Sequence, residues 1–282
     1  MFQAATVGEF PLLMPKVTPS LAETYLCTPI RMDTEDTYYI VGFKPNATKM
    51  TAHHMLIYGC EEPGDSSPTW NCGEMAVVEP GLESHPVCAS GSQVIYAWAM
   101  DAPALHLPEG VGFRVGANTN IKYLVLQVHY ASTDYIDPRG DDSGVVLQYT
   151  EQEQPMTAGV LLLGTGGSAP AHSTTYFETA CQVQDPRTIH PFAFRTHTHS
   201  LGKEEILIKP ERFITTSHVP SSLSQWRLLC IQRRRNDHNK RTTGPICPTK
   251  RLIALERTIL KTGDISLSVY ILQFTILIPA SV

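Results

Sequence analysis

The sequence of 282 residues contains no apolar run of about 20 residues, the length that a membrane-spanning helix needs, so we expect no membrane insertion. The C-terminal segment SVYILQFTILIPA comes closest and is too short. The start, MFQAATVGEFPLLMPK, has neither a positively charged region nor an adequate apolar stretch, so no signal peptide is visible. No two cysteines show the C-x-x-C spacing that is typical of structural zinc sites.

The sequence also lacks any long segment with a 3.6-residue apolar period, which argues against a helical fold. Several short segments are instead rich in β-branched and aromatic residues, and most are separated by Pro, Gly, Asp or Ser clusters. This pattern predicts an all-β protein built from jelly-roll-like antiparallel β-sandwiches. Residues 151–155 (EQEQP) are interpreted as a linker between two such modules. The predicted strands are residues 37–43, 54–60, 94–100, 122–130, 143–150, 158–164 and 191–199.

The net charge of −5 hides a strong asymmetry along the chain. Residues 1–202 carry 9 basic and 21 acidic side chains, whereas residues 203–282 carry 13 basic and 6 acidic ones. Such a reversal indicates two segments of different character. The basic cluster Arg233–Arg235 has no interleaved aromatic residues and lies in no recognisable nucleic-acid fold, so no nucleic-acid partner is expected. A solvated face or a disordered arm is the alternative.

The seven cysteines are the main indicator of the cellular compartment. Four of them, Cys27, Cys60, Cys72 and Cys88, lie near the start of the chain. Disulfides formed in an oxidising compartment are one interpretation, and reduced buried cysteines are the other. The sequon Asn46-Ala47-Thr48 agrees with secretion.

Histidines occur in strand-like contexts in a pattern typical of metal ligands. In the stretch RTHTHSLGK, His197 and His199 are two residues apart, so on an extended strand they point to the same face. Two neighbouring imidazoles provide half of a transition-metal site, although a surface pair on an edge strand has the same sequence pattern.

A second histidine group consists of His53, His54 and His129. On a regular strand His53 and His54 would point to opposite faces. They can therefore share one metal only near a bend or through different ring nitrogens. His129 shares its predicted face with Gln127, which could line a cleft beside these histidines.

Five blocks of sequence, in this order along the chain, resemble the copper type II ascorbate-dependent monooxygenase family: HHMLIYGC, YAWAMDAP, LPEGVGFRVG, YLVLQVHY and FAFRTHTHSLGK. The resemblance covers roughly residues 14–203. It implies two β-sandwich domains, each with one copper ion, facing a water-filled cleft. His53, His54 and His129 match the ligands of the electron-storing copper, and His197 and His199 match two ligands of the oxygen-binding copper.

The resemblance also implies a function. Arg195, directly before the His-Thr-His motif, matches the arginine that grips a substrate carboxylate in the peptide-hydroxylating branch of the family. Members of that branch use O2 and ascorbate to hydroxylate the α-carbon of a C-terminal glycine, a step of peptide hormone amidation. The resemblance further implies the disulfides Cys27–Cys72 and Cys60–Cys88, and glycine-extended peptides as substrates. We expect a monomer in the secreted or secretory-vesicle compartment.

The resemblance to the family ends near residue 203. The family supplies a methionine as third ligand of the second copper, and no methionine follows Met156 here. We therefore expect an incomplete second domain, a first copper site that forms, a weak second site, and turnover that is lost or very low. The alternatives are a truncated, catalytically impaired, secreted copper-binding protein and a catecholamine-type β-monooxygenase. The expected organisation is an N-terminal extension (1–13), a first copper-binding sandwich (14–150), a partial second sandwich (151–203) and a divergent basic tail (204–282).

Overall fold

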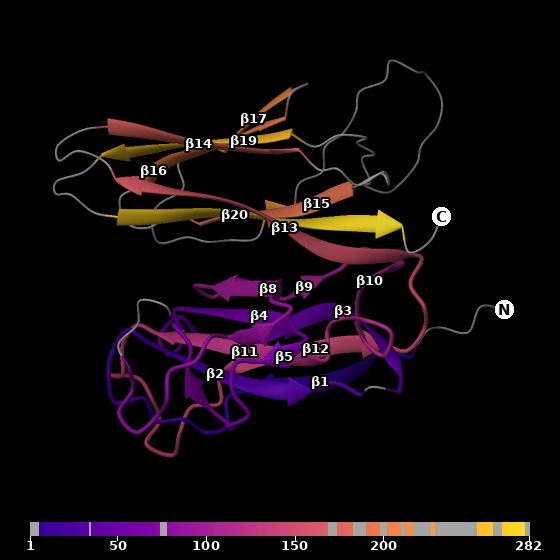
Figure 1. The fold of residues 1–282 in the computed structure, drawn as a ribbon, viewed down its shortest axis with the longest axis vertical. Helices are drawn as coiled ribbons and strands as arrows, with labels where there is room; N and C mark the ends of the chain where they lie inside the picture. Colours follow the sequence, from indigo (N-terminus) through magenta and orange to yellow (C-terminus); the bar gives the residue numbers. More distant parts are fainter. Residues whose placement is uncertain are drawn as a thin grey trace. The chain divides into compact units, whose positions relative to one another are not determined.

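The computed structural model consists of strands and connecting turns, and the residues that it describes contain no helix (Figure 1). The chain divides into two compact units, Met1–Thr157 and Ala158–Val282, which are described separately. The backbone is described for residues 6–33, 35–73, 78–168, 174–182, 190–197, 202–209, 212–216, 227–228, 253–261 and 267–279, and the side chains for residues 6–33, 35–73, 78–161, 192 and 193.

The first unit contains an antiparallel sheet of five strands in the order β6-β2-β11-β4-β8. Strand β11 is central, and its residues pair with β2 on one side and with β4 on the other. The strands are β2 (Thr24–Arg31), β4 (His54–Cys60), β6 (Trp70–Asn71), β8 (Gln93–Ala99) and β11 (Tyr123–Tyr130).

A second sheet of this unit has the order β1-β12-β3-β10, and the short strand β9 pairs with β3. The first two residues of β13 (Met156–Ser168) also belong to this unit and pair in parallel with β10. A small separate sheet is formed by β5 (Glu62–Pro63) and β7 (Cys88–Ser90). The strands of the second sheet are β1 (Gly8–Leu13), β3 (Thr37–Asn46), β9 (Leu105–His106), β10 (Val111–Gly116) and β12 (Gly144–Thr150).

Aromatic side chains join the two larger sheets into a sandwich. Phe43 of β3 stacks on Tyr96 of β8, with ring centroids 4.3 Å apart and planes 2° apart. Phe113 of β10 adds an edge contact to Phe43 at 6.0 Å. All three side chains are buried. Aromatic pairs of this kind stabilise a core by about 0.5–1.5 kcal/mol beyond the area that they bury.

Strand β11 is buried on both faces, although a sandwich strand usually exposes one face. The second covering layer comes from a cluster in which Val125 lies with Trp70 and the cysteines Cys27, Cys60 and Cys72. The face of β11 that carries Val125, Gln127 and His129 is therefore covered at one end by cross-linked segments.

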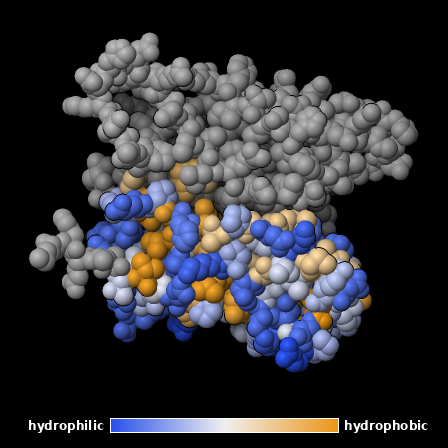
Figure 2. All heavy atoms as spheres, turned by 180° about the vertical axis from the view of Figure 1, so that it is seen from behind, coloured by the Kyte–Doolittle hydropathy of each residue, from blue (hydrophilic) through white to orange (hydrophobic). Residues whose placement is uncertain are grey.

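The surface of the first unit mixes hydrophilic side chains with small apolar patches on the face seen in Figure 2. Among the described residues the large exposed apolar side chains are Val7, Phe10, Met50, Val78 and Tyr135. A search of the described residues finds no helix of the length and apolarity required to cross a membrane.

In the second unit one sheet has the order β13-β20-β15-β18 and another has the order β14-β19-β16-β17. The segment after residue 203, for which no strand was predicted, supplies several of these strands. The reason is compositional: residues 253–261 and 267–279 are rich in β-branched and apolar residues that pair with strand edges left open by the earlier segments. The strands are β14 (Thr174–Gln182), β15 (His190–His197), β16 (Gly202–Lys209), β17 (Arg212–Thr216), β18 (Arg227–Leu228), β19 (Ile253–Lys261) and β20 (Leu267–Pro279).

The all-β prediction is confirmed, and each predicted strand overlaps an observed one. Among the longer strands of the first unit, β1, β2 and β10 were not predicted. The first two contain a proline, Pro11 and Pro29, and β10 contains Gly112 in its interior. These residues weaken strand signals, but tertiary packing overrides them here.

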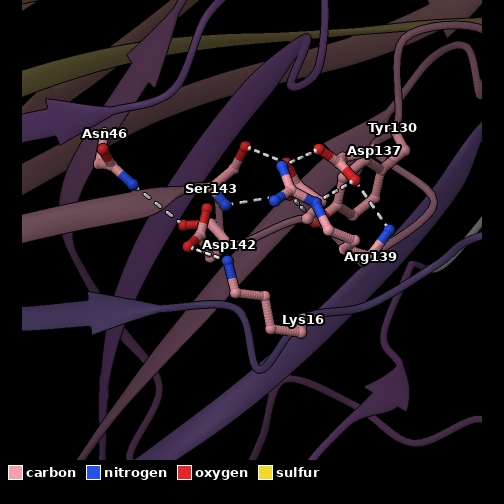
Figure 3. Close-up of polar contacts among 8 residues, drawn as sticks. Lys16, Asn46, Tyr130, Asp137, Arg139, Asp142 and Ser143 are labelled. Atoms are coloured by element: carbon pink, nitrogen blue, oxygen red, sulfur yellow. Dashed lines mark hydrogen bonds and ion pairs between the residues drawn. The ribbon is translucent and has the colours of Figure 1, made fainter.

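The buried carboxylate of Asp141 fixes the segment that follows β11, and Figure 3 labels its partners Tyr130 and Ser143. Asp141 accepts hydrogen bonds from the Tyr130 hydroxyl at 2.7 Å, from the Ser143 backbone N–H at 3.0 Å and from the Ser143 hydroxyl at 2.8 Å. Asp141 is 8% exposed and Tyr130 is fully buried. Burial and the adjacent Asp141 raise the pKa of Tyr130 well above its ordinary range.

The substitution Tyr130→Phe is expected to lower the free energy of unfolding by about 1–3 kcal/mol at neutral pH, because a buried acceptor loses a donor. An unfolded tyrosine ionises near pH 10, whereas the folded phenol resists ionisation. The contribution of Tyr130 is therefore complete below about pH 10 and is lost as the pH rises further. In urea denaturation, the difference in the free energy of unfolding between the parent and Tyr130→Phe should be smaller above pH 10 than at pH 7. Tyr135→Phe, at an exposed position, is the control, and an equal loss in both variants would contradict the prediction.

Candidate metal centre

Strand register places two histidines of the first unit side by side. His129 of β11 lies opposite His54 of β4 and, on its other side, opposite Tyr25 of β2. Directly opposed residues in antiparallel strands project to the same face, with Cβ atoms about 4.5–5.5 Å apart. The His54 and His129 ring centroids are accordingly 4.8 Å apart.

The third histidine, His53, stands at a bend directly before β4 begins. Its backbone N–H donates to the carbonyl oxygen of His129 at 2.9 Å. Because the chain bends here, His53 does not follow the alternation of β4, and its ring lies beside those of the other two histidines. The bend that His53 and His54 would need in order to share one ion is therefore present.

The ring nitrogens of the three histidines converge. His54 Nδ1 lies 3.3 Å from His53 Nδ1 and 3.4 Å from His129 Nδ1, and one ligand atom from each residue lies within 4.8 Å of the others. Imidazole–metal bonds of about 2 Å at roughly tetrahedral or trigonal angles place two nitrogens about 3.3–3.5 Å apart. The three side chains therefore fit a single transition-metal ion, and all-imidazole ligation is compatible with copper.

The His129 ring is held by two neighbours. Its Nε2 lies 2.9 Å from Glu23 Oε2, and Tyr25 stacks on it with ring centroids 4.1 Å apart and planes 10° apart. Burial lowers the pKa of His129, and Glu23 partly offsets this effect. Burial and the Glu23 charge raise the pKa of Tyr25 to about 12. The lowered pKa favours the neutral form of His129, which is the form of imidazole that binds metals.

Gln127 does not lie with the histidines, although it shares their predicted face. It is buried, and its side-chain amide donates to the Cys72 carbonyl oxygen at 3.2 Å. Gln127 therefore supports the covering segment and does not line an open cleft.

Two disulfides cross-link the first unit, Cys27–Cys72 and Cys60–Cys88, the pairing that the family resemblance implies. Cys27 lies on β2, two residues beyond Tyr25. The Cys72 backbone N–H donates to the Tyr25 carbonyl oxygen at 3.1 Å. The cross-link is thereby coupled to the strand that flanks the histidine cluster. Disulfides are typical of proteins in an oxidising compartment.

The residues predicted for a second site fall in the second unit. Arg195 and His197 lie two positions apart on β15, paired in register with Gln273 and Ile271 of β20. Their backbone positions are described, but their side chains are not, and His199 lies outside the described residues. A second metal site built on this pair remains a prediction.

Sequence reasoning missed Glu23 and Tyr25, which contact His129. Neither belongs to a local motif, and β2 itself was not predicted. Their proximity follows from the pairing of β2 with β11, about 100 residues further along the chain, which no local pattern encodes.

An antiparallel sandwich with three converging imidazoles is typical of a β-sandwich metalloprotein, since imidazole suits copper, zinc, iron and nickel. Residues 10–137 match the family model described as copper type II ascorbate-dependent monooxygenase, N-terminal domain, and residues 156–222 match the C-terminal domain of the same family. The chain belongs to the copper type II ascorbate-dependent monooxygenase family. The C-terminal match continues to residue 222 and so includes the beginning of the segment that was expected to diverge.

Relatives with established names support the same assignment. The chain is 41% identical over 193 residues to peptidyl-glycine alpha-amidating monooxygenase A of Xenopus laevis, an alignment that covers 67% of this chain and 19% of the relative. It is 38% identical to peptidylglycine alpha-amidating monooxygenase of Rattus norvegicus, and this alignment covers 67% of this chain and 18% of the relative. Its identity to dopamine beta-hydroxylase of Homo sapiens is 29%, over 61% of this chain and 29% of the relative. The chain thus spans about a fifth of the length of the amidating relatives that it matches.

Proposed function

We propose that this chain is a copper-dependent peptidylglycine α-hydroxylating monooxygenase. The observation that supports this most directly is the convergence of His53, His54 and His129 at ligand spacing, in a chain with 38–41% identity to amidating monooxygenases. The proposed reaction inserts one oxygen atom of O2 into the α C–H bond of a C-terminal glycine. The other oxygen atom is reduced to water with two electrons from ascorbate and two protons.

The residues of the chain have separate roles in this proposal. Bound copper supplies one-electron redox chemistry that connects ascorbate to O2. His53, His54 and His129 would hold one copper ion, and His197 with His199 would contribute ligands to a second. Arg195 binds the C-terminal carboxylate of the peptide through its planar guanidinium, whose paired N–H groups match a carboxylate. The domain roles proposed are a first copper-binding sandwich over residues 14–150 and a contribution to the second from residues 151–203.

The proposed setting is the secretory-vesicle lumen or the extracellular space, and the proposed form is a monomer. The two disulfides and the sequon at Asn46, which ends β3 at an exposed position, support this setting. Glycine-extended peptides, O2 and ascorbate are the proposed partners.

A second candidate is a copper-binding protein without turnover. It is favoured by the absence of any methionine after Met156, since the family resemblance calls for a methionine ligand at the oxygen-binding ion. In this alternative the first site binds copper and the second binds it weakly.

One experiment separates the two candidates. The copper-loaded full chain is incubated with ascorbate, O2 and a peptide that ends in glycine, and the peptide mass is followed for the gain of one oxygen atom. Conversion that requires ascorbate and fails with the same peptide carrying a C-terminal amide supports the monooxygenase, and Arg195→Ala should then raise KM by about 10-fold or more. Copper uptake without product would select the binding protein. Hydroxylation of a phenethylamine in place of the peptide would select the catecholamine-type enzyme.

A further inference from the structure

Glu23 occupies an unusual backbone conformation directly before β2. Its φ is +57°, in the left-handed region that residues other than glycine rarely adopt. Backbone outliers of this kind cost free energy and persist only where the surrounding structure imposes them, which is frequent at functional sites. From this position the Glu23 carboxylate reaches His129, with Oε2 at 2.9 Å from Nε2.

The turn that carries Glu23 is fixed by a second, buried carboxylate. Glu79, 8% exposed, accepts hydrogen bonds from the Ser20 backbone N–H at 2.8 Å and from the Leu21 backbone N–H at 3.2 Å. The Thr24 hydroxyl donates to the Leu21 carbonyl oxygen at 2.7 Å and closes the turn. Contacts on both sides of Glu23 therefore hold its backbone in place.

The contact with Glu23 decides which nitrogen of His129 can bind a metal. An ionised carboxylate only accepts hydrogen bonds, so Nε2 of a neutral His129 carries the hydrogen and donates it. Nδ1 is then unprotonated, and its lone pair points to the side where His54 Nδ1 lies 3.4 Å away. A carboxylate that accepts from the second nitrogen of a ligating imidazole fixes its tautomer and orientation and increases its basicity.

We propose that Glu23 is a positioning residue for the metal centre, which keeps His129 in the Nε2–H tautomer and directs Nδ1 to the ion. This inference rests on the copper site described under Proposed function. Loss of such a partner typically weakens metal binding by about 10–100-fold. We expect that loss for Glu23→Ala and Glu23→Gly. A smaller loss is expected for Glu23→Gln, whose amide oxygen still accepts a hydrogen bond but carries no charge.

The test uses the full chain with His197→Ala and His199→Ala, so that only the first site is titrated. Cu(I) affinity is measured by competition with a chromophoric chelator, and the Cu(II) form is examined by electron paramagnetic resonance. Thermal unfolding without copper provides the structural comparison. Glu23→Gly is the most informative variant, because glycine accepts the left-handed conformation without strain. Its copper-free melting temperature should equal or exceed that of the parent while its copper affinity falls. Glu35→Ala, at an exposed position, is the matched control.

Equal copper affinities in the parent, Glu23→Gly and Glu23→Gln would overturn this assignment alone. A fall in the copper-free melting temperature of Glu23→Gly that accompanies the loss of affinity would also overturn it, since the role would then be structural. Absence of Cu(I) binding by the parent would overturn the metal site together with the assignment.

Discussion

Replacement of His129 by alanine is expected to weaken copper binding in the first unit by more than about 100-fold, because it removes a ligand and not merely a group that orients one. His129 is the buried member of the cluster and the one that both β2 and β4 flank in register. In the chain with His197→Ala and His199→Ala, the bound copper should fall from one ion per chain to none under dilute conditions. Elemental analysis after gel filtration measures the ratio.

The control for this prediction is His106→Ala. His106 is exposed on β9, which belongs to the other sheet. Its replacement by alanine should therefore leave the copper content unchanged. Thermal unfolding of the copper-free His129→Ala chain checks that the sandwich still folds. Retention of a tightly bound ion by a folded His129→Ala variant would show that these imidazoles are not the ligands.

Removal of the Cys27–Cys72 disulfide is expected to lower the free energy of unfolding of the first unit by about 4 kcal/mol. The cross-link joins residues that are 45 positions apart, and it reduces the conformational entropy of the unfolded chain. Both cysteines are buried, so the double alanine variant avoids leaving polar hydroxyls in the core. Copper affinity should fall as well, because the Cys72 N–H supports the Tyr25 backbone beside His129.

The matched comparison is the double alanine variant of Cys60 and Cys88. That loop spans 28 positions, and the expected loss is slightly smaller, about 3.5 kcal/mol. Denaturant unfolding gives both values, and copper titration gives the second readout. If the Cys27–Cys72 variant kept the parental stability, the disulfide would have no role in fixing β2.

The sequence predicted the central strands of the first unit well, because they alternate or run continuously in β-branched and aromatic residues. It predicted β4 and β11, which carry His54 and His129, to within a residue at each end. It missed β2 because Pro29 interrupts the pattern. With β2 it also missed Glu23 and Tyr25, so the surroundings of the site were less predictable than its ligands.

The segment after residue 203 is the other part of the chain whose strands were not predicted. Its local sequence pattern does not predict strands along much of its length, and its net positive charge contrasts with the net negative charge of the preceding residues. The structure nevertheless gives β19 and β20, which pair with β14, β15 and β16. Strand formation depends on the edge that is available as partner, and a local pattern does not contain that information.

The sequence by itself determined the β architecture, the imidazole character of the ligands and the family, because side-chain chemistry and local periodicity are properties of short segments. Only the tertiary structure decided that the bend at His53 and the register of β2, β11 and β4 bring three ring nitrogens and one carboxylate together. Register is set by the burial of whole strand faces, and a shift of one residue would send His129 to the opposite face of the sheet.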